Sequence, residues 1–308
     1  MCGAAWGGEP LMLINPGRET FINFPSAVLP DKTVTVFLPE AAVPLHGKYP
    51  VVYLLGAGPK DAAAVQDLLA RSTKKAILVG VNITEGDLKN QPEILHFFSR
   101  ELIPYIDTNY PTLSEPSSRA VAAQGAGQVR LLAALLAKKQ LFARAFVSGS
   151  SPEPTSFAGA DEKLRLLAAG NREELTVLWQ TLQDAGRAYG AQVALRIAPQ
   201  AALTDGLDLD YLFAAPSDVQ MVKLEGQLGT KTLWMTPLAQ ANLSVWAVLA
   251  NGMKFDYIPL SVRLSPPYLS WEPAQGVLRP VSGASAGKVK ISVVVDKLIF
   301  TGKIRLKK

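Results

Sequence analysis

The chain has 308 residues, of which 48% are hydrophobic and 19% are charged, and its formal net charge is +5. This apolar fraction excludes general disorder, and the length allows one large core and a second, smaller one. The single cysteine, Cys2, excludes an internal disulfide and a cysteine-based zinc cluster. Because no stretch reaches the roughly 18 uninterrupted apolar residues of a membrane helix, we expect no membrane span.

The first residues, MCGAAWGGEP, lack a basic segment followed by an apolar run, so we expect no signal peptide in the chain as given. A processed bacterial lipoprotein begins with cysteine followed by small residues, as in Cys2-Gly3-Ala4-Ala5. A lipid anchor at Cys2 is therefore one interpretation, and an ordinary start that happens to contain cysteine is the other.

The first two hundred residues alternate short β-branched runs with longer helical patterns, which predicts a mostly parallel sheet flanked by helices. The expected strands are Thr33–Leu38, Val51–Leu55, Ala76–Val81, Ala120–Ala123, Ala145–Ser148, Leu164–Ala168 and Gln192–Ile197. The expected helices, with apolar residues every three or four positions, are Ala62–Ser72, Glu93–Asp107, Gly127–Lys138 and Glu173–Tyr189. Pro104 predicts a bend in the second helix.

After Pro216 the helical periodicity ends and strands with turn dipeptides follow. Asn251-Gly252 predicts a hairpin between Leu243–Ala250 and Met253–Leu260. Asp296-Lys297 predicts a second one between Val289–Val295 and Leu298–Leu306. We therefore expect two domains, an α/β domain over residues 1–216 and a small all-β, immunoglobulin-like sandwich over residues 217–308.

Basic side chains gather near the end of the chain. One interpretation is an acidic partner surface, and the other is that exposed strand lysines deter edge-to-edge pairing. No aromatic-interleaved basic motif accompanies the charge, so we expect no nucleic-acid partner. The residues are Lys288, Lys290, Lys297, Lys303, Arg305, Lys307 and Lys308.

Several segments in chain order resemble an esterase family of α/β-hydrolases that includes enterochelin esterases, feruloyl esterases and S-formylglutathione hydrolase. The resemblance covers about residues 20–215 and implies an α/β-hydrolase fold. The matching segments are VTVFLPE at Val34–Glu40, YPVVYLL at Tyr49–Leu55, ILVGV at Ile77–Val81, FFSRELIPYIDTNYPT at Phe97–Thr112, RAVAAQGAG at Arg119–Gly127 and FARAFVSGSSP at Phe142–Pro152.

Hydrolases of this fold carry a nucleophilic serine in G-x-S-x-G, on a strained turn between a strand and a helix. The corresponding segment here is Ala123-Gln124-Gly125-Ala126-Gly127, and the resemblance places Gly125 where the serine belongs. Glycine tolerates a positive φ but has no side chain to form an acyl-enzyme. The resemblance thus implies a preserved turn without its nucleophile.

The triad of this fold follows the chain order serine, acid, histidine. The two histidines, His46 and His96, both precede the elbow. Under the resemblance, Leu207 in Gly206-Leu207-Asp208 stands where histidine belongs, and Glu173 or Glu174 stands at the acid position. We therefore expect no catalytic residues and no esterase activity.

The loop that supplies oxyanion donors in the family, Leu-His-Gly, corresponds to Leu55-Gly56-Ala57-Gly58. Together with the elbow it predicts a pocket that binds a small carboxylate or sugar without turnover. The expected pocket residues are Gly56, Ala57, Gln124, Gly125, Ala126, Ser150 and Asp208.

Two functions remain open at this point. The favoured hypothesis is a non-catalytic esterase homologue that acts as a binding or structural module, with residues 217–308 contacting a protein partner or a second copy. The alternative is a hydrolase of carboxylic or carbohydrate esters with non-standard residues, using carboxylates at Asp205–Asp210 and Glu173. The spacing of these acids does not match a calcium loop, so we expect no metal, and no complete cofactor motif is present. Cys2 and the β-domain favour a periplasmic or cell-surface location in a bacterium.

Overall fold

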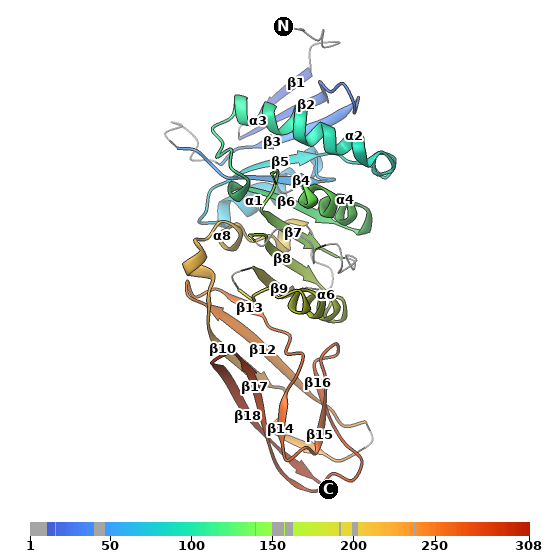
Figure 1. Ribbon diagram of the computed structural model, residues 1–308, viewed down its shortest axis with the longest axis vertical. Coiled ribbons are helices and arrows are strands. Elements are labelled where there is room, and N and C mark those ends of the chain that lie inside the picture. Colours follow the sequence, from blue (N-terminus) through green and yellow to red (C-terminus); the bar gives the residue numbers. More distant parts are fainter. Residues whose placement is uncertain are drawn as a thin grey trace. The chain divides into compact units, whose positions relative to one another are not determined.

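The computed structural model describes residues 11–15, 17–39, 47–138, 140–149, 157, 163–190, 192–198, 203–236 and 238–308, without the side chains of 11–15 and 205. The chain forms two compact units (Figure 1). Unit 1 comprises Met1–Leu167 and Ala201–Phe213, and unit 2 comprises Ala168–Gln200 and Ala214–Lys308.

Unit 1 contains a mixed sheet with the neighbour order β1-β2-β3-β5-β4-β6-β7. The pairs from β1 to β5 are antiparallel, and those between β5, β4, β6 and β7 are parallel. All five residues of β4 and of β5 are buried, as expected for continuous apolar runs in a covered parallel sheet. The strands are β1 (Leu11–Asn15), β2 (Arg18–Phe24), β3 (Lys32–Phe37), β4 (Val51–Leu55), β5 (Ile77–Val81), β6 (Arg119–Gln124) and β7 (Arg144–Ser148).

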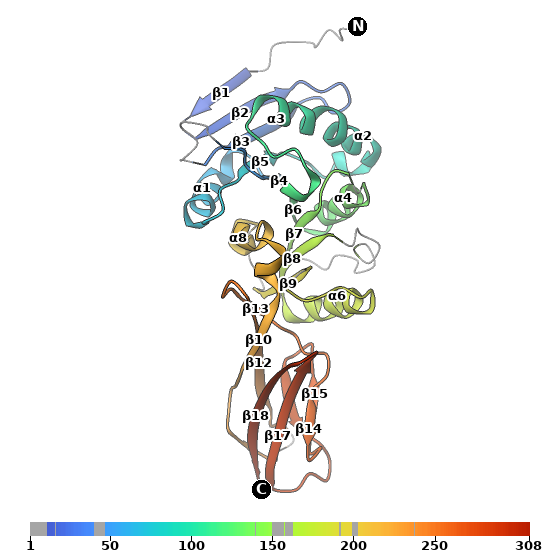
Figure 2. The same cartoon turned by 60° about the vertical axis from the view of Figure 1, so that its left-hand side comes forward.

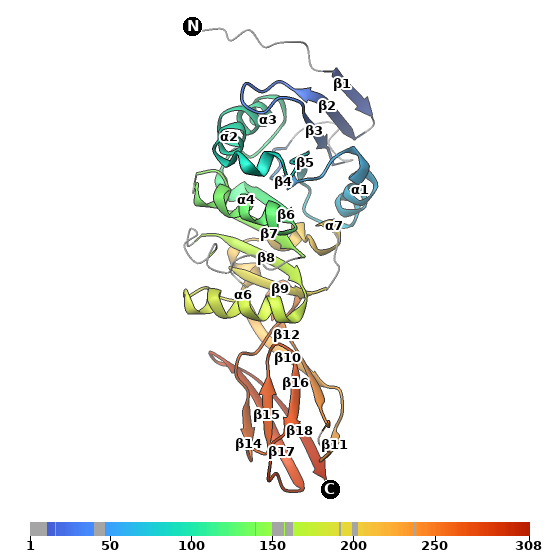
Figure 3. The ribbon, with the colours of Figure 1, turned by 90° about the vertical axis from the view of Figure 1, so that its right-hand side faces the viewer.

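Helices cover both faces of this sheet. Figures 2 and 3 show α1 on one face and α2, α3 and α4 on the other. Among the described residues, the helices of unit 1 are η1 (Pro59–Asp61), α1 (Ala62–Arg71), η2 (Asp87–Lys89), α2 (Gln91–His96), η3 (Phe97–Leu102), α3 (Ile103–Asn109), η4 (Pro116–Ser118), α4 (Ala126–Ala137), α7 (Leu203–Gly206) and α8 (Leu209–Leu212), where η marks short 3-10 or π segments.

The helix expected over Glu93–Asp107 is divided into three parts, because the segment Phe97–Leu102 between α2 and α3 is a π-helix. Pro104 follows directly in the first turn of α3. Its ring nitrogen cannot donate a hydrogen bond to the preceding turn, which accounts for the irregular segment before it. Phe97, Phe98 and Leu102 nevertheless all lie in the core.

Unit 2 contains two sheets and α6 (Arg172–Asp184). In one sheet, β12 pairs with β10, β13 and β16, while β16 pairs with β15 and β13 with β9. The other sheet has the order β11-β18-β17-β14. The strands are β9 (Val193–Ile197), β10 (Met221–Leu228), β11 (Thr232–Trp234), β12 (Ala241–Leu249), β13 (Lys254–Asp256), β14 (Arg263–Ser265), β15 (Leu269–Glu272), β16 (Val277–Pro280), β17 (Gly287–Val295) and β18 (Leu298–Lys307). β8 (Arg165–Gly170) begins in unit 1 and ends in unit 2, and η5 is Pro216–Val219.

The expected fold class is confirmed, with a helix-covered α/β sheet and a strand-rich C-terminal region. Both expected hairpins form, with Val248 opposite Lys254 and Val295 opposite Leu298. The expected division at residues 216 and 217 differs from the compact units, because β9 pairs with β13 and joins unit 2. Among the described residues, no helix is both long and apolar enough to span a bilayer.

Candidate functional site

The turn between β6 and α4 has its apex at Gly125. Its backbone angles are φ 87° and ψ 153°, a region that side-chain-bearing residues rarely occupy. Its N–H donates to the carbonyl oxygens of Gly149 (3.1 Å) and Ser148 (3.3 Å), which join the carboxyl ends of β6 and β7. The elbow geometry is therefore built and held, but its apex residue presents no nucleophile.

The side chain of Gln128, in the first turn of α4, lies next to the apex. A Cβ built on Gly125 would lie 3.4 Å from Gln128 Oε1, and one built on Gly56 would lie 3.6 Å from Gln128 Nε2. The carboxamide thus spans from the elbow to the loop after β4. It occupies the space next to the position from which a serine side chain would project.

A cavity of about 360 Å³ lies beside this carboxamide, at the carboxyl ends of β4 and β6. It brings together three of the expected pocket residues, Gly56, Ala57 and Gln124, whereas Gly125, Ala126 and Asp208 do not line it. Ser150 lies outside the described residues. The full lining is Leu55, Gly56, Ala57, Lys60, Asp61, Ala64, Val65, Gln124, Gln128, Leu203 and Thr204.

Two backbone amides of the loop after β4 already donate hydrogen bonds within the protein. Gly56 N donates to the carbonyl oxygen of Val81 (2.8 Å), and Gly58 N donates to Oδ2 of Asp61 (2.8 Å). A donor that is already hydrogen-bonded within the protein cannot at the same time stabilise a developing oxyanion. These two amides therefore fix the loop to the end of β5 and to η1.

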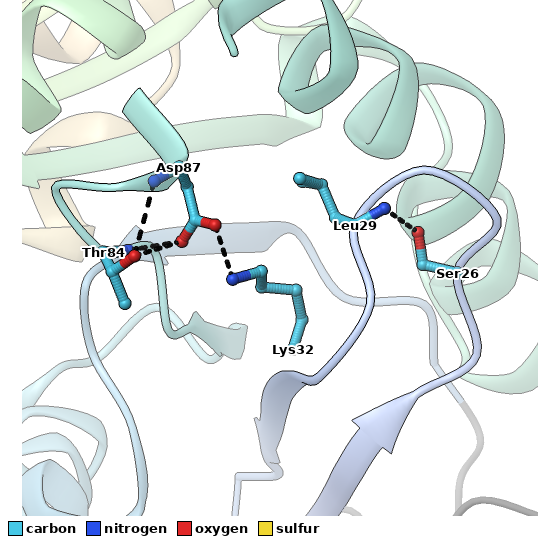
Figure 4. A network of polar contacts seen from close by, with 5 residues as sticks. All are labelled: Ser26, Leu29, Lys32, Thr84 and Asp87. Atoms are coloured by element: carbon cyan, nitrogen blue, oxygen red, sulfur yellow. Dashed lines mark hydrogen bonds and ion pairs between the residues drawn. The ribbon is translucent and has the colours of Figure 1, made fainter. Parts of the chain in front are cut away.

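A partly buried polar network holds the segment that packs against the first turn of α4. Asp87 accepts hydrogen bonds from Lys32 Nζ and from both Thr84 N and Thr84 Oγ1, each at 2.7 Å (Figure 4). Burial alone would raise the pKa of the Asp87 carboxyl, but these hydrogen bonds lower it below its ordinary value. The adjacent Leu88 approaches so closely that a Cβ on Gly127 would lie 2.5 Å from Leu88 Cδ1.

The segment from α7 to α8 contains the position expected to correspond to the family's histidine. Leu207 is only 2% exposed and belongs to the core. Asp208 caps α8 by accepting from Tyr211 N (2.9 Å). Asp210 accepts from Thr73 Oγ1, Thr73 N and Lys74 N. These two carboxylates therefore stabilise backbone amides at the start of α8 and in the segment after α1.

The remaining sequence-predicted residues are dispersed. Glu173 is exposed in the first turn of α6 in unit 2, after the N-cap Asn171, which accepts from Glu174 N. His96 is exposed and lines a different hollow, beside Pro92 and Lys138, and His46 lies outside the described residues. Among the described residues, no group of three or more His, Cys, Asp or Glu side chains is placed to hold a metal ion.

Sequence reasoning missed Gln128, Lys60, Asp61 and Thr204 as lining residues. The signal for Gln128 was available, because a polar residue three positions after Gly125 falls on the same side of the first helical turn. No comparable signal marked Thr204, which reaches the cavity from a segment distant in sequence.

Comparison with known proteins places this geometry in context. The model of the family described as "Putative esterase" matches residues 26–205, more than half of the chain. No curated protein matches. Similar solved structures include a ferulic acid esterase, with 18% identity, coverage of 60% of this chain and 90% of that one, and a TM-score of 0.48.

Two further structures are similar at the same level. The IroE-like serine hydrolase of Shewanella oneidensis shares 15% identity with this chain, and the two superpose with a TM-score of 0.46. The match covers 65% of this chain and 78% of the hydrolase. The enterobactin esterase of Shigella flexneri shares 15% identity with this chain, with a TM-score of 0.48. The match covers 69% of this chain and 60% of the esterase. Because the family model matches more than half of the chain, including β3, the elbow and the cavity-lining residues, the chain belongs to this esterase family.

Proposed function

We propose that this chain is a non-catalytic member of its family, a pseudo-esterase that binds a small polar molecule without turning it over. The observation that carries the proposal is the elbow apex, where Gly125 stands with positive φ and the carboxamide of Gln128 lies over it. Covalent ester hydrolysis requires a nucleophile at this place, and glycine has none.

Two further observations support the loss of chemistry. No histidine follows residue 96, so the triad order of the fold cannot be completed. The amide of Gly56 already donates to the carbonyl oxygen of Val81 at the end of β5, and that of Gly58 to the Asp61 carboxylate. A general base and oxyanion donors each accelerate ester hydrolysis through separate interactions. Here the base position lacks histidine, and two amides of the oxyanion loop are already hydrogen-bonded.

The cavity supports a binding role. Amide groups of Gln124 and Gln128 and the hydroxyl of Thr204 can exchange hydrogen bonds with sugar hydroxyls, and the ammonium of Lys60 can pair with a carboxylate. The volume of about 360 Å³ suits a ligand the size of one sugar ring. We therefore propose a small carboxylate or sugar as the ligand class, with unit 2 serving in attachment or assembly.

Absence of turnover is tested with p-nitrophenyl esters and glycosides. We expect no hydrolysis above the uncatalysed rate for the natural chain or for the Asp208→Asn and Glu173→Gln variants. Turnover by the natural chain that disappears in either variant would instead establish a hydrolase with non-standard carboxylate machinery.

Binding is tested by titration calorimetry with glucuronate, which carries both a carboxylate and sugar hydroxyls. We expect Gln128→Leu to weaken binding about tenfold, because one buried hydrogen-bonding group is worth about 1.4 kcal/mol to such a ligand. Gln66→Leu, an exposed glutamine of α1 that does not line the cavity, is the matched control and should bind as the natural chain does. Equal losses in both variants would contradict a site at this cavity.

A further inference from the structure

The outward face of the sheet β11-β18-β17-β14 in unit 2 carries an unusual concentration of cations. Side chains alternate along β17 and β18, so that Val289, Ile291, Ile304 and Leu306 are buried while the neighbouring basic residues are exposed. The register carries this face onto β14, because Arg263 lies opposite Ser292. We define the basic face as Arg263, Lys288, Lys290, Lys303, Arg305 and Lys307.

Like charges stand directly opposite one another on this face. Lys288 pairs with Arg305, and Lys290 pairs with Lys303. Directly opposed like charges destabilise a sheet, and no ion pair with a described carboxylate relieves them. An arrangement that costs stability in this way indicates a binding role.

Protection of a sheet edge does not explain the five basic residues of β17 and β18. β17 and β18 are the two inner strands of the four, flanked by β14 and β11. Lysines that deter aggregation belong on exposed edge strands. The interpretation of the basic residues as edge protection is therefore not favoured by their place in the sheet.

Exposed apolar side chains border the basic face at both ends. Val294 and Ile299 lie opposite each other near the hairpin turn and are 49% and 61% exposed. At the other end Trp234 is 56% exposed, pairs in register with Lys307, and has the Lys307 ammonium 5.3 Å from its ring centroid. Tryptophan and lysine are the side chains that favour the interface between a bilayer and water.

We propose that the basic face binds the surface of a lipid bilayer that carries anionic headgroups. Six cations fall within the range of four to eight that is typical of anionic-lipid recognition, and the bordering apolar residues can enter the headgroup layer. A protein interface is less favoured because lysine is depleted there. Single-stranded nucleic acid is less favoured because Trp234 is the one aromatic side chain among the described residues of this face.

The test is cosedimentation of the full chain, in a Cys2→Ser background so that no acyl chain contributes, with vesicles. Phosphatidylcholine containing a minor fraction of phosphatidylglycerol is compared with phosphatidylcholine alone. We expect binding only to the anionic vesicles, with loss in about 1 M salt, where the screening length falls to about 3 Å.

The decisive variant is Lys290→Glu, because it places a carboxylate opposite Lys303 and creates a cross-strand ion pair. The fold should therefore be at least as heat-stable as that of the natural chain. Vesicle binding should fall about 25-fold, since two cations are neutralised at about fivefold each. Lys89→Glu, an exposed lysine of unit 1 with the same change in net charge, should bind vesicles as before.

Equal binding by Lys290→Glu and Lys89→Glu would overturn the proposal. So would equal binding of the natural chain to neutral and anionic vesicles. Retention on heparin or duplex DNA without binding to anionic vesicles would also overturn it, and would assign the face to a different polyanion.

Discussion

Replacing Gly125 by alanine tests whether the elbow is held in a conformation that only glycine tolerates. A Cβ at this position would lie 3.4 Å from Gln128 Oε1, which is close to an ordinary contact, so the main cost is the backbone at φ 87° and ψ 153°. A side-chain-bearing residue in such a region costs about 1–3 kcal/mol. We therefore expect Gly125→Ala to lower the free energy of unfolding of unit 1 by that amount.

Hydrogen exchange followed by mass spectrometry of peptides from β6 and α4 measures this loss directly, and their slowest amides should exchange about 5- to 160-fold faster. Tryptophan fluorescence would not report it, because the tryptophans described in the structure lie in unit 2. Gly58→Ala is the matched control, since Gly58 has extended backbone angles and open space around its Cα. Equal destabilisation by the two substitutions would refute the strain argument.

Three further perturbations follow from the contacts. Asp87→Asn should cost about 2–3 kcal/mol, because it leaves the buried Lys32 ammonium without its ion pair. The pKa of Asp87 is lowered in the folded state. The difference in unfolding free energy between the natural chain and Asp87→Asn, measured in urea, should therefore be largest above about pH 5 and shrink as the pH falls through the folded pKa. A constant difference down to about pH 2 would contradict this. Arg165→Met should lower the thermal midpoint by several degrees, because the guanidinium donates to the carbonyl oxygens of Tyr211 and Leu212 in a buried site; an unchanged midpoint would argue against that role. Gly226→Val should destabilise unit 2 by about 1–3 kcal/mol in tryptophan-detected unfolding, since its Cβ would lie 2.7 Å from the Phe300 ring; Gly229→Val, whose nearest Cβ contact would be an ordinary 3.4 Å to Asn242, should cost less.

The sequence predicted those elements whose pattern is local. Val51–Leu55 matches β4 at both ends, because five consecutive apolar residues can only be buried on both faces. The turn at Asp296-Lys297 is likewise placed correctly, with Asp296 in the left-handed region that such turns require. The start of α4 differs from the expectation by one residue, since Gly125 caps the helix.

Features that depend on long-range contacts were not predictable in this way. The irregular helix at Phe97–Leu102 keeps the same apolar periodicity as an ordinary helix, so the periodicity alone could not reveal it. β1 and β2 carry too little apolar alternation to be recognised before β3 is known to be their neighbour. Thr204 lines the cavity because residues 201–213 belong to unit 1. No local sequence pattern predicts that part of the chain after β9 is placed there.

The glycine at the apex of the elbow was readable from the sequence because the resemblance located one turn, and the structure supplied the neighbouring side chain. Gln128 would be an ordinary helix residue without the distances to Gly56 and Gly125. The basic residues near the C-terminus, by contrast, were visible in the sequence. Only the strand register shows that they form cross-strand pairs of like charge on the two inner strands.

The central claim, that no activated serine is present, is tested most directly by treating the purified chain with a fluorophosphonate probe and measuring its intact mass, beside a Gly125→Ser variant. We expect no adduct on the natural chain and at most slow, partial labelling of the variant, because no histidine follows the elbow to activate the new hydroxyl. A stoichiometric adduct on the natural chain would reveal an activated serine elsewhere and would contradict the assignment as a pseudo-esterase.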